Sequence, residues 1–85
     1  MPERTERKSV ALRYDASMPA PLVVAKGRGR VAERIESIAR EAGVAIVSDG
    51  PLASGLEPVD IGEYVPPEYW ELVARVLVFI RKVRL

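Results

Sequence analysis

The sequence predicts a small α/β domain, in which a mixed β-sheet of about four strands carries three helices. Two observations predict this class. Short runs rich in valine, isoleucine and leucine alternate along the chain with segments of helical periodicity, and glycines and prolines separate them. The length, 85 residues, suffices for one domain with a modest core. The expected strands lie near residues 9–14, 22–25, 44–47 and 59–61, and the expected helices lie near residues 29–42, 51–56 and 66–82.

The two expected N-terminal strands follow a charged segment. Residues 1–8 lack apolar periodicity and predict a flexible arm, which leaves residues 9–85 as the single domain. In residues 9–14 the larger apolar side chains occupy alternate positions, as in a strand with one buried face. Residues 22–25 are continuously apolar, as in a strand covered on both faces.

The segment 29–47 predicts a helix followed by a strand. Val31, Ile35, Ile38 and Ala42 share one helical stripe, and Gly43 suits the end of that helix. The apolar run 44–47 then predicts a buried strand. Because a strand, a helix and a strand follow one another, we expect strands 22–25 and 44–47 to be parallel with a right-handed crossover.

The remaining elements are marked by prolines. Pro51 suits the first turn of a short helix over residues 51–56, and Pro66 and Pro67 open the last helix. Between them, residues 59–61 predict a short extra strand. The basic end of the last helix matches the negative end of its dipole.

The last helix carries more apolar surface than one core requires. A first set of residues at helical spacing, flanked by Leu72 and Phe79, is sufficient to dock it on the sheet: Tyr69, Val73, Val76, Ile80 and Val83. A second ridge contains Trp70, Ala74 and Leu77, with Val78 beside it. The ridge either packs against a neighbouring helix or the loop 15–21, or forms a partner-binding surface, and apolar surface ridges often mark such sites.

The composition offers little for catalysis. The chain has no histidine, cysteine, asparagine or glutamine, and its formal net charge is +1. We therefore expect no enzyme, no metal and no cofactor, and a protein partner rather than a small-molecule substrate. The apolar runs are too short for a membrane span, so we expect a cytoplasmic protein. The basic turn 26–30 and the basic tail keep nucleic-acid binding open as an alternative.

Eight segments of the chain follow one another in a characteristic order and spacing: Val10–Asp15, Ala20–Gly27, Ala32–Ile35, Ile38–Ala39, Val44–Val47, Pro51–Ala53, Ile61–Gly62 and Val76–Leu77. This order resembles the C-terminal cytoplasmic domain of the FlhB/YscU family of flagellar and type III export-gate proteins. The resemblance covers roughly residues 9–80.

The resemblance implies a place and a role for partner binding. In the family, an apolar patch receives segments of export substrates, and the matching residues here are Ala20, Pro21, Ala74 and Leu77, with Trp70 as a neighbour. It implies a non-catalytic accessory at the cytoplasmic face of the export apparatus that docks export substrates or gate components. The alternatives of a flagellar or another secretion role, and of a partner or a second copy on the ridge, remain open.

The chain departs from the family pattern in two ways. The family carries a membrane domain before this one, and we expect a stand-alone relative without it. Family members also carry an Asn-Pro-Thr-His self-cleavage motif, where this chain has Arg4, Thr5, Glu6 and Arg7. Because that cleavage requires an asparagine side chain, the sequence predicts no autocleavage.

Overall fold

The sheet is a two-stranded antiparallel hairpin of β1 (Lys8–Arg13) and β2 (Leu22–Arg28). This computed structural model describes the backbone of residues 7–84 and the side chains of residues 7–82. Ala11 pairs with Ala25 and Leu12 with Val23, so Val24 is an extra residue that forms a β-bulge. Both strands were predicted near these positions, and both are present.

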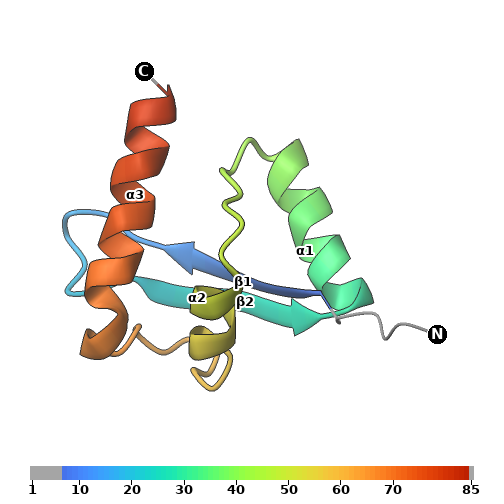
Figure 1. Cartoon of the computed structure of the whole chain (residues 1–85), viewed down its shortest axis with the longest axis horizontal. Helices are drawn as coiled ribbons and strands as arrows, with labels where there is room; N and C mark the ends of the chain where they lie inside the picture. Colours follow the sequence, from blue (N-terminus) through green and yellow to red (C-terminus); the bar gives the residue numbers. More distant parts are fainter. Residues whose placement is uncertain (1–6, 85) are drawn as a thin grey trace.

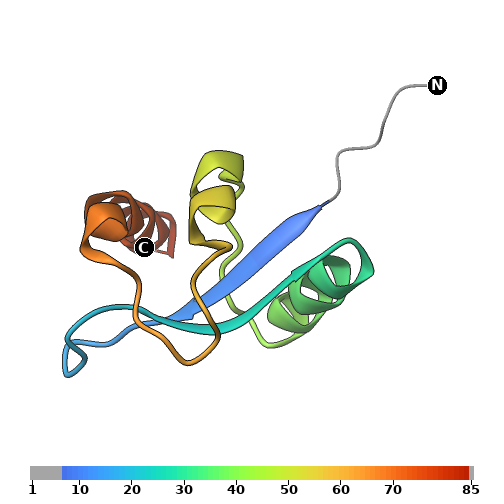
Figure 2. The same cartoon turned by 90° about the horizontal axis from the view of Figure 1, so that it is seen from below.

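The helices cover the two faces of this sheet. Helix α1 (Arg30–Glu41) lies on one face, and α2 (Gly50–Leu56) and α3 (Trp70–Arg84) lie on the other (Figures 1 and 2). A short 3₁₀ helix, η1 (Pro67–Tyr69), leads into α3. The three predicted helices are therefore confirmed, with the first turn of the last one tightened into η1. Each described helix is too short or too polar to span a bilayer.

The core lies on the face that α2 and α3 cover. Its buried residues come from β2, α2, the loop before η1, and α3, and they are Val23, Leu52, Leu56, Val65 and Val73. Val10 and Leu12 of β1 pack against this cluster with their side chains partly buried. The alternation predicted for the first strand therefore directs its larger side chains to this core.

The prediction of a strand at residues 44–47 is wrong. These residues have no regular secondary structure, and the predicted parallel pairing with 22–25 is absent from the described residues. The connection from α1 to α2 passes from one face of the sheet to the other, so it crosses the sheet instead of following it (Figures 1 and 2). Val44 and Ile46 are accordingly 55% and 45% exposed.

The prediction of a strand at residues 59–61 is also wrong, and with it the count of about four strands. Val59 N donates to Leu56 O at 3.0 Å, and Glu63 N donates to Asp60 O at 3.0 Å, so this stretch consists of turns. Gly62 has a φ of 91° and suits a turn position that other residues disfavour. The extra pairing with the sheet occurs slightly later, where Tyr64 forms an isolated bridge with Leu22.

Helix α1 docks through a stripe that is rotated from the predicted one. Ala32 is fully buried, and Glu36, on the side of α1 that faces β1, is half-buried. Val31 and Ile38, which were predicted to face the sheet, are 56% and 53% exposed. Gly27 of β2 allows the start of α1 to lie close to the strand, because a Cβ at this position would meet Val31 Cγ1 at 2.2 Å.

Candidate protein-docking site

A shallow apolar hollow of about 200 Å³ lies between the loop after β1 and the first half of α3. Its lining contains all five residues that the sequence and the family resemblance selected: Ala20, Pro21, Trp70, Ala74 and Leu77. Tyr14 and Pro19 complete the lining. Two segments about fifty residues apart in the sequence therefore meet at one surface site.

The loop side of the hollow is held by local hydrogen bonds. Asp15 Oδ1 accepts from the backbone N–H of Ser17 at 2.9 Å and also from the Ser17 hydroxyl. These bonds stabilise the charged carboxylate, so they lower the pKa of Asp15 from its ordinary value of 3.8. Pro21 O accepts from Val65 N at 2.8 Å, which ties the end of the loop to the segment before η1.

Trp70 is fixed at the start of α3. Its indole Nε1 donates to Val65 O at 2.7 Å, while 46% of the residue stays exposed. This bond satisfies the one polar atom of the side chain, so the remaining ring surface is apolar and ordered. Val65 thus positions both sides of the hollow, through Pro21 and through Trp70.

The α3 side of the hollow follows the ridge that periodicity predicted. Ala74 is exposed, and Leu77 is half-buried and contacts the core. Val73, one position before Ala74, is enclosed in the core, so the helix turns one face inward and the ridge outward. Val78 is 52% exposed and lies outside the lining.

Tyr14 and Pro19 are lining residues that the sequence analysis did not select. Tyr14 extends the alternation of β1 past the end of that strand, and Pro19 precedes two selected residues. Alternation suggested a buried position for Tyr14, and the exposed ring could not be anticipated without knowing where the loop turns. The tyrosine hydroxyl is the single ionisable group of the lining.

The chemistry of the hollow suits an apolar side chain. Its lining holds no carboxylate, ammonium or guanidinium group. Elsewhere in the described chain, no group of three or more acidic side chains is arranged to bind a metal ion. The hollow can therefore remove apolar groups of a partner from water, and nothing in its lining resembles a nucleophile beside a base.

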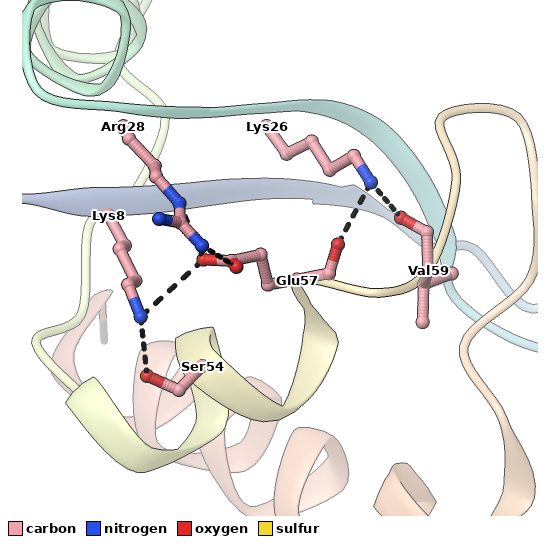
Figure 3. A network of polar contacts seen from close by, with 6 residues as sticks. All are labelled: Lys8, Lys26, Arg28, Ser54, Glu57 and Val59. Carbon is pink, nitrogen blue, oxygen red and sulfur yellow. Dashed lines mark hydrogen bonds and ion pairs between the residues drawn. The ribbon is translucent and has the colours of Figure 1, made fainter.

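A second hollow, also of about 200 Å³, is lined in part by basic residues on the α2 face. Figure 3 shows the polar contacts there: Lys26 Nζ donates to Glu57 O at 2.9 Å and to Val59 O at 2.8 Å, and Arg28 Nε donates to Glu57 Oε2 at 3.0 Å. Lys8 Nζ lies 3.5 Å from Glu57 Oε2. Two basic residues of the turn 26–30 are thus engaged within the chain, which weakens the nucleic-acid alternative.

The positions that match the self-cleavage motif lie mostly outside the described residues. Arg4, Thr5 and Glu6 are in that part of the chain. Arg7 is described and exposed: its guanidinium contacts Glu36 of α1 at 3.0 Å, and its carbonyl accepts from Gly29 N at 2.7 Å. Arg7 therefore acts as a tether for the start of β1.

Taken together, the fold and the hollow define a class: a small α/β domain whose candidate site is an apolar surface hollow lined by a loop and a helix. The family model described as FlhB HrpN YscU SpaS Family matches residues 6–80. The chain belongs to this family.

Individual relatives agree with this assignment. The flagellar biosynthetic protein FlhB of Bacillus subtilis (strain 168) is 38% identical over 78 residues, which make up 89% of this chain and 22% of that protein. The uncharacterized protein YlqH of the same strain is 39% identical over 84 residues, covering 96% of this chain and 90% of YlqH. The chain spans about a fifth of the length of the FlhB proteins it matches.

Solved structures give the same result for the fold. The cytoplasmic domain of FlhB from Shewanella putrefaciens superposes with a TM-score of 0.85 at 35% identity, over 91% of this chain and 64% of that one. The PscU C-terminal domain gives a TM-score of 0.81 at 29% identity, over 86% and 95% of the two chains. The match is therefore to the C-terminal cytoplasmic part of these proteins.

Proposed function

We propose that this protein is a non-catalytic, cytoplasmic accessory of flagellar or related type III protein export, and that its apolar hollow docks export substrates or gate components. One observation carries the proposal. Periodicity selected a ridge on the last helix, the family resemblance selected loop and helix positions, and all five residues line a single hollow. A surface with this lining gains free energy by covering apolar groups of a partner.

The geometry favours a short segment over a folded partner. The hollow is shallow and small, about 200 Å³, so it accommodates side chains of a linear segment. Trp70 presents an ordered aromatic surface beside it, and aromatic residues are frequent binding hot spots. An apolar anchor in a flexible terminal segment of an export substrate fits this arrangement.

The direct test replaces Ala74 by glutamate. Ala74 is exposed, so Ala74→Glu should fold normally while placing an unpaired charge against the docked apolar group. We expect about tenfold or greater loss of affinity for synthetic N-terminal segments of export substrates, or for purified gate-protein cytoplasmic domains. Isothermal titration calorimetry with circular dichroism of each variant provides the measurement.

Leu72→Asp is the matched control. Leu72 is on the same helix and 42% exposed, but it does not line the hollow. The Leu72→Asp substitution should therefore leave the affinity for the peptides and domains unchanged. Leu77→Asp should weaken this affinity, as Ala74→Glu does. A folded Ala74→Glu protein that binds both kinds of probe as tightly as the wild type would refute the docking site.

Trp70 provides an independent readout. It is the single tryptophan of the chain and borders the hollow. A partner group that covers its half-exposed ring should shift its fluorescence emission to shorter wavelength, because the indole leaves water. Binding without any change of this emission would place the partner elsewhere on the domain.

A further inference from the structure

The segment that follows α2, residues 57–65, joins the second hollow to the docking hollow. Its first residue, Glu57, lines the second hollow, and its last residue, Val65, bonds to residues of the docking hollow. The segment consists of turns and one isolated bridge, so its position depends on the bonds that tie it to its neighbours. We call residues 57–65 the strap.

The C-terminal end of the strap places two lining residues of the docking hollow. Val65 O accepts from the indole of Trp70 at 2.7 Å, and Val65 N donates to Pro21 O at 2.8 Å. Just before it, Gly62 N donates to Val23 O of β2 at 2.8 Å. A displacement of the strap along β2 would therefore move both the helix side and the loop side of the docking hollow.

Lys26 holds the N-terminal end of the strap. Its side chain extends from β2, and Nζ donates to Glu57 O at 2.9 Å and to Val59 O at 2.8 Å (Figure 3). Glu57 is the C-cap residue of α2, where the helix dipole favours a cation. The side chain of Lys26 is 26% exposed, so these charge-assisted bonds are partly shielded from water.

We propose that Lys26 is a positioning residue for the docking hollow, which it orders by fixing the strap. This inference rests on the proposed function of that hollow. The ammonium group suits the task because it donates to two strap carbonyls from a single point on β2. A hollow that is ordered before the partner arrives has a larger population of the binding-competent state, and its affinity is correspondingly higher.

Lys8 provides a matched comparison. It has the same side chain and lines the same second hollow as Lys26. Its Nζ lies 3.5 Å from Ser54 Oγ and 3.5 Å from Glu57 Oε2, which are side-chain atoms and not strap carbonyls. Substitution of each lysine by methionine therefore separates the loss of a positive charge from the loss of the bonds that hold the strap backbone.

The test measures Trp70 fluorescence and NMR hydrogen exchange in the protein without a partner. In Lys26→Met we expect faster exchange at the amides of Gly62 and Val65, and Trp70 emission at longer wavelength, because a loosened strap exposes more of the indole to water. Lys26→Arg should restore both wild-type values, since a guanidinium can donate to both carbonyls. Lys8→Met should match the wild type in both measurements.

Affinity for synthetic N-terminal segments of export substrates provides the functional readout. Lys26→Met should bind them about fivefold more weakly, as follows if the binding-competent fraction falls to about one fifth. Ala32→Gly lowers stability from the opposite face of the sheet and should bind as tightly as the wild type. This control separates a loss of positioning from a general loss of stability.

The proposal is overturned by wild-type exchange and emission in Lys26→Met, by an equal change in Lys8→Met, by failure of Lys26→Arg to restore the values, or by unchanged affinity of Lys26→Met where Ala74→Glu binds weakly. Should Lys26→Met not fold, exchange in the wild type decides: the amides of Gly62 and Val65 should open with one free energy, and independent opening would overturn the proposal. Failure of the docking function is distinguishable, because Ala74→Glu would then bind normally while the partner-free measurements keep their expected values.

Discussion

At the scale of single residues, Glu36 connects α1 to β1. Its carboxylate accepts from Ser9 Oγ at 2.5 Å and contacts Arg7 at 3.0 Å and Arg40 at 3.6 Å. Of these three contacts, only the one with Arg40, four residues away on the same helix, follows the spacing of a helix. The contacts with Ser9 and Arg7 join residues 27 and 29 positions apart, which spacing along one helix cannot show.

The bond from Ser9 should contribute measurably to stability. Ser9 is buried and Glu36 is half-buried, so Ser9→Ala removes a charge-assisted hydrogen bond from a partly dry site. We expect the free energy of unfolding to fall by about 1 kcal/mol, measured by urea denaturation. Ser37→Ala, at an exposed position on α1, is the control and should change it by less than about 0.5 kcal/mol.

Glu57 gives the protein a pH-dependent element of stability. Its hydrogen bonds from the Arg28 guanidinium, with a smaller contribution from Lys8, lower the pKa of the Glu57 carboxyl from its ordinary value of 4.5. The folded state therefore binds this proton less readily than the unfolded state does. The stabilisation is present above pH 4.5 and is lost as the pH falls through the folded-state pKa.

Glu57→Gln should test this linkage. The variant should be less stable than the wild type at neutral pH, and the gap between their urea midpoints should narrow as the pH falls below 4.5. Glu33→Gln, at an exposed position of α1, should follow the wild-type profile. A gap for Glu57→Gln that stays constant down to pH 3 would contradict the assignment.

The lack of asparagine leads to a covalent prediction. Self-cleavage at an Asn-Pro motif needs the asparagine side chain, and this chain contains no asparagine. We expect intact-mass spectrometry of purified protein to show one species after prolonged storage. Appearance of a spontaneous fragment broken near residues 4–7 would require a different cleavage chemistry.

At the scale of elements, the helices were predictable and the outer strands were not. Helix ends carry local signals, such as Pro51 at the start of α2, whose Asp49 side chain caps Leu52 N at 3.1 Å. The run 44–47 has strand composition, but its pairing depends on which face of the sheet the next helix occupies. Composition and periodicity do not contain that information.

In the docking hollow too, the helical part could be predicted from the sequence and the loop part could not. The ridge on α3 was visible from the spacing of Trp70, Ala74 and Leu77, because helical periodicity fixes which side chains share a face. Periodicity left open whether the ridge was covered by the loop 15–21. The structure leaves Ala74 exposed at the rim of the hollow, and the part played by Tyr14 and Pro19 follows from the path of the loop.

The packing of α2 depends on Gly55, although glycine is a poor helix former and alanine would be favoured by helix propensity alone. A Cβ at Gly55 would meet Tyr69 Cε1 at 2.6 Å, so alanine at this position would displace the Tyr69 ring, which packs against the core. Gly55→Ala should therefore lower the free energy of unfolding, although the same change raises intrinsic helix stability by about 1 kcal/mol. Ser54→Ala, at the neighbouring exposed position, should lie within about 0.5 kcal/mol of the wild type in the same urea experiment.

At the scale of the whole molecule, the core lies on one side of the sheet. The enclosed cluster joins β2, α2 and α3, whereas α1 on the opposite face buries Ala32 fully and leaves Val31 and Ile38 about half exposed. Regions with few buried apolar contacts open locally at a lower free energy than the whole molecule unfolds. The domain should therefore consist of a stable layer around α2 and α3 and a less stable α1.

Native-state hydrogen exchange can resolve these two layers. Amides of α1 should exchange through local opening, while amides in the middle of α3 should require global unfolding. Val23→Ala, which removes two methyl groups from a fully enclosed site, should lower the opening free energy of α3 by about 2 kcal/mol. The same substitution should hardly change the values for α1, because its local opening does not expose Val23. If α1 and α3 instead lose equal protection in Val23→Ala, the two faces unfold as one cooperative unit, and the division of stability between them is wrong.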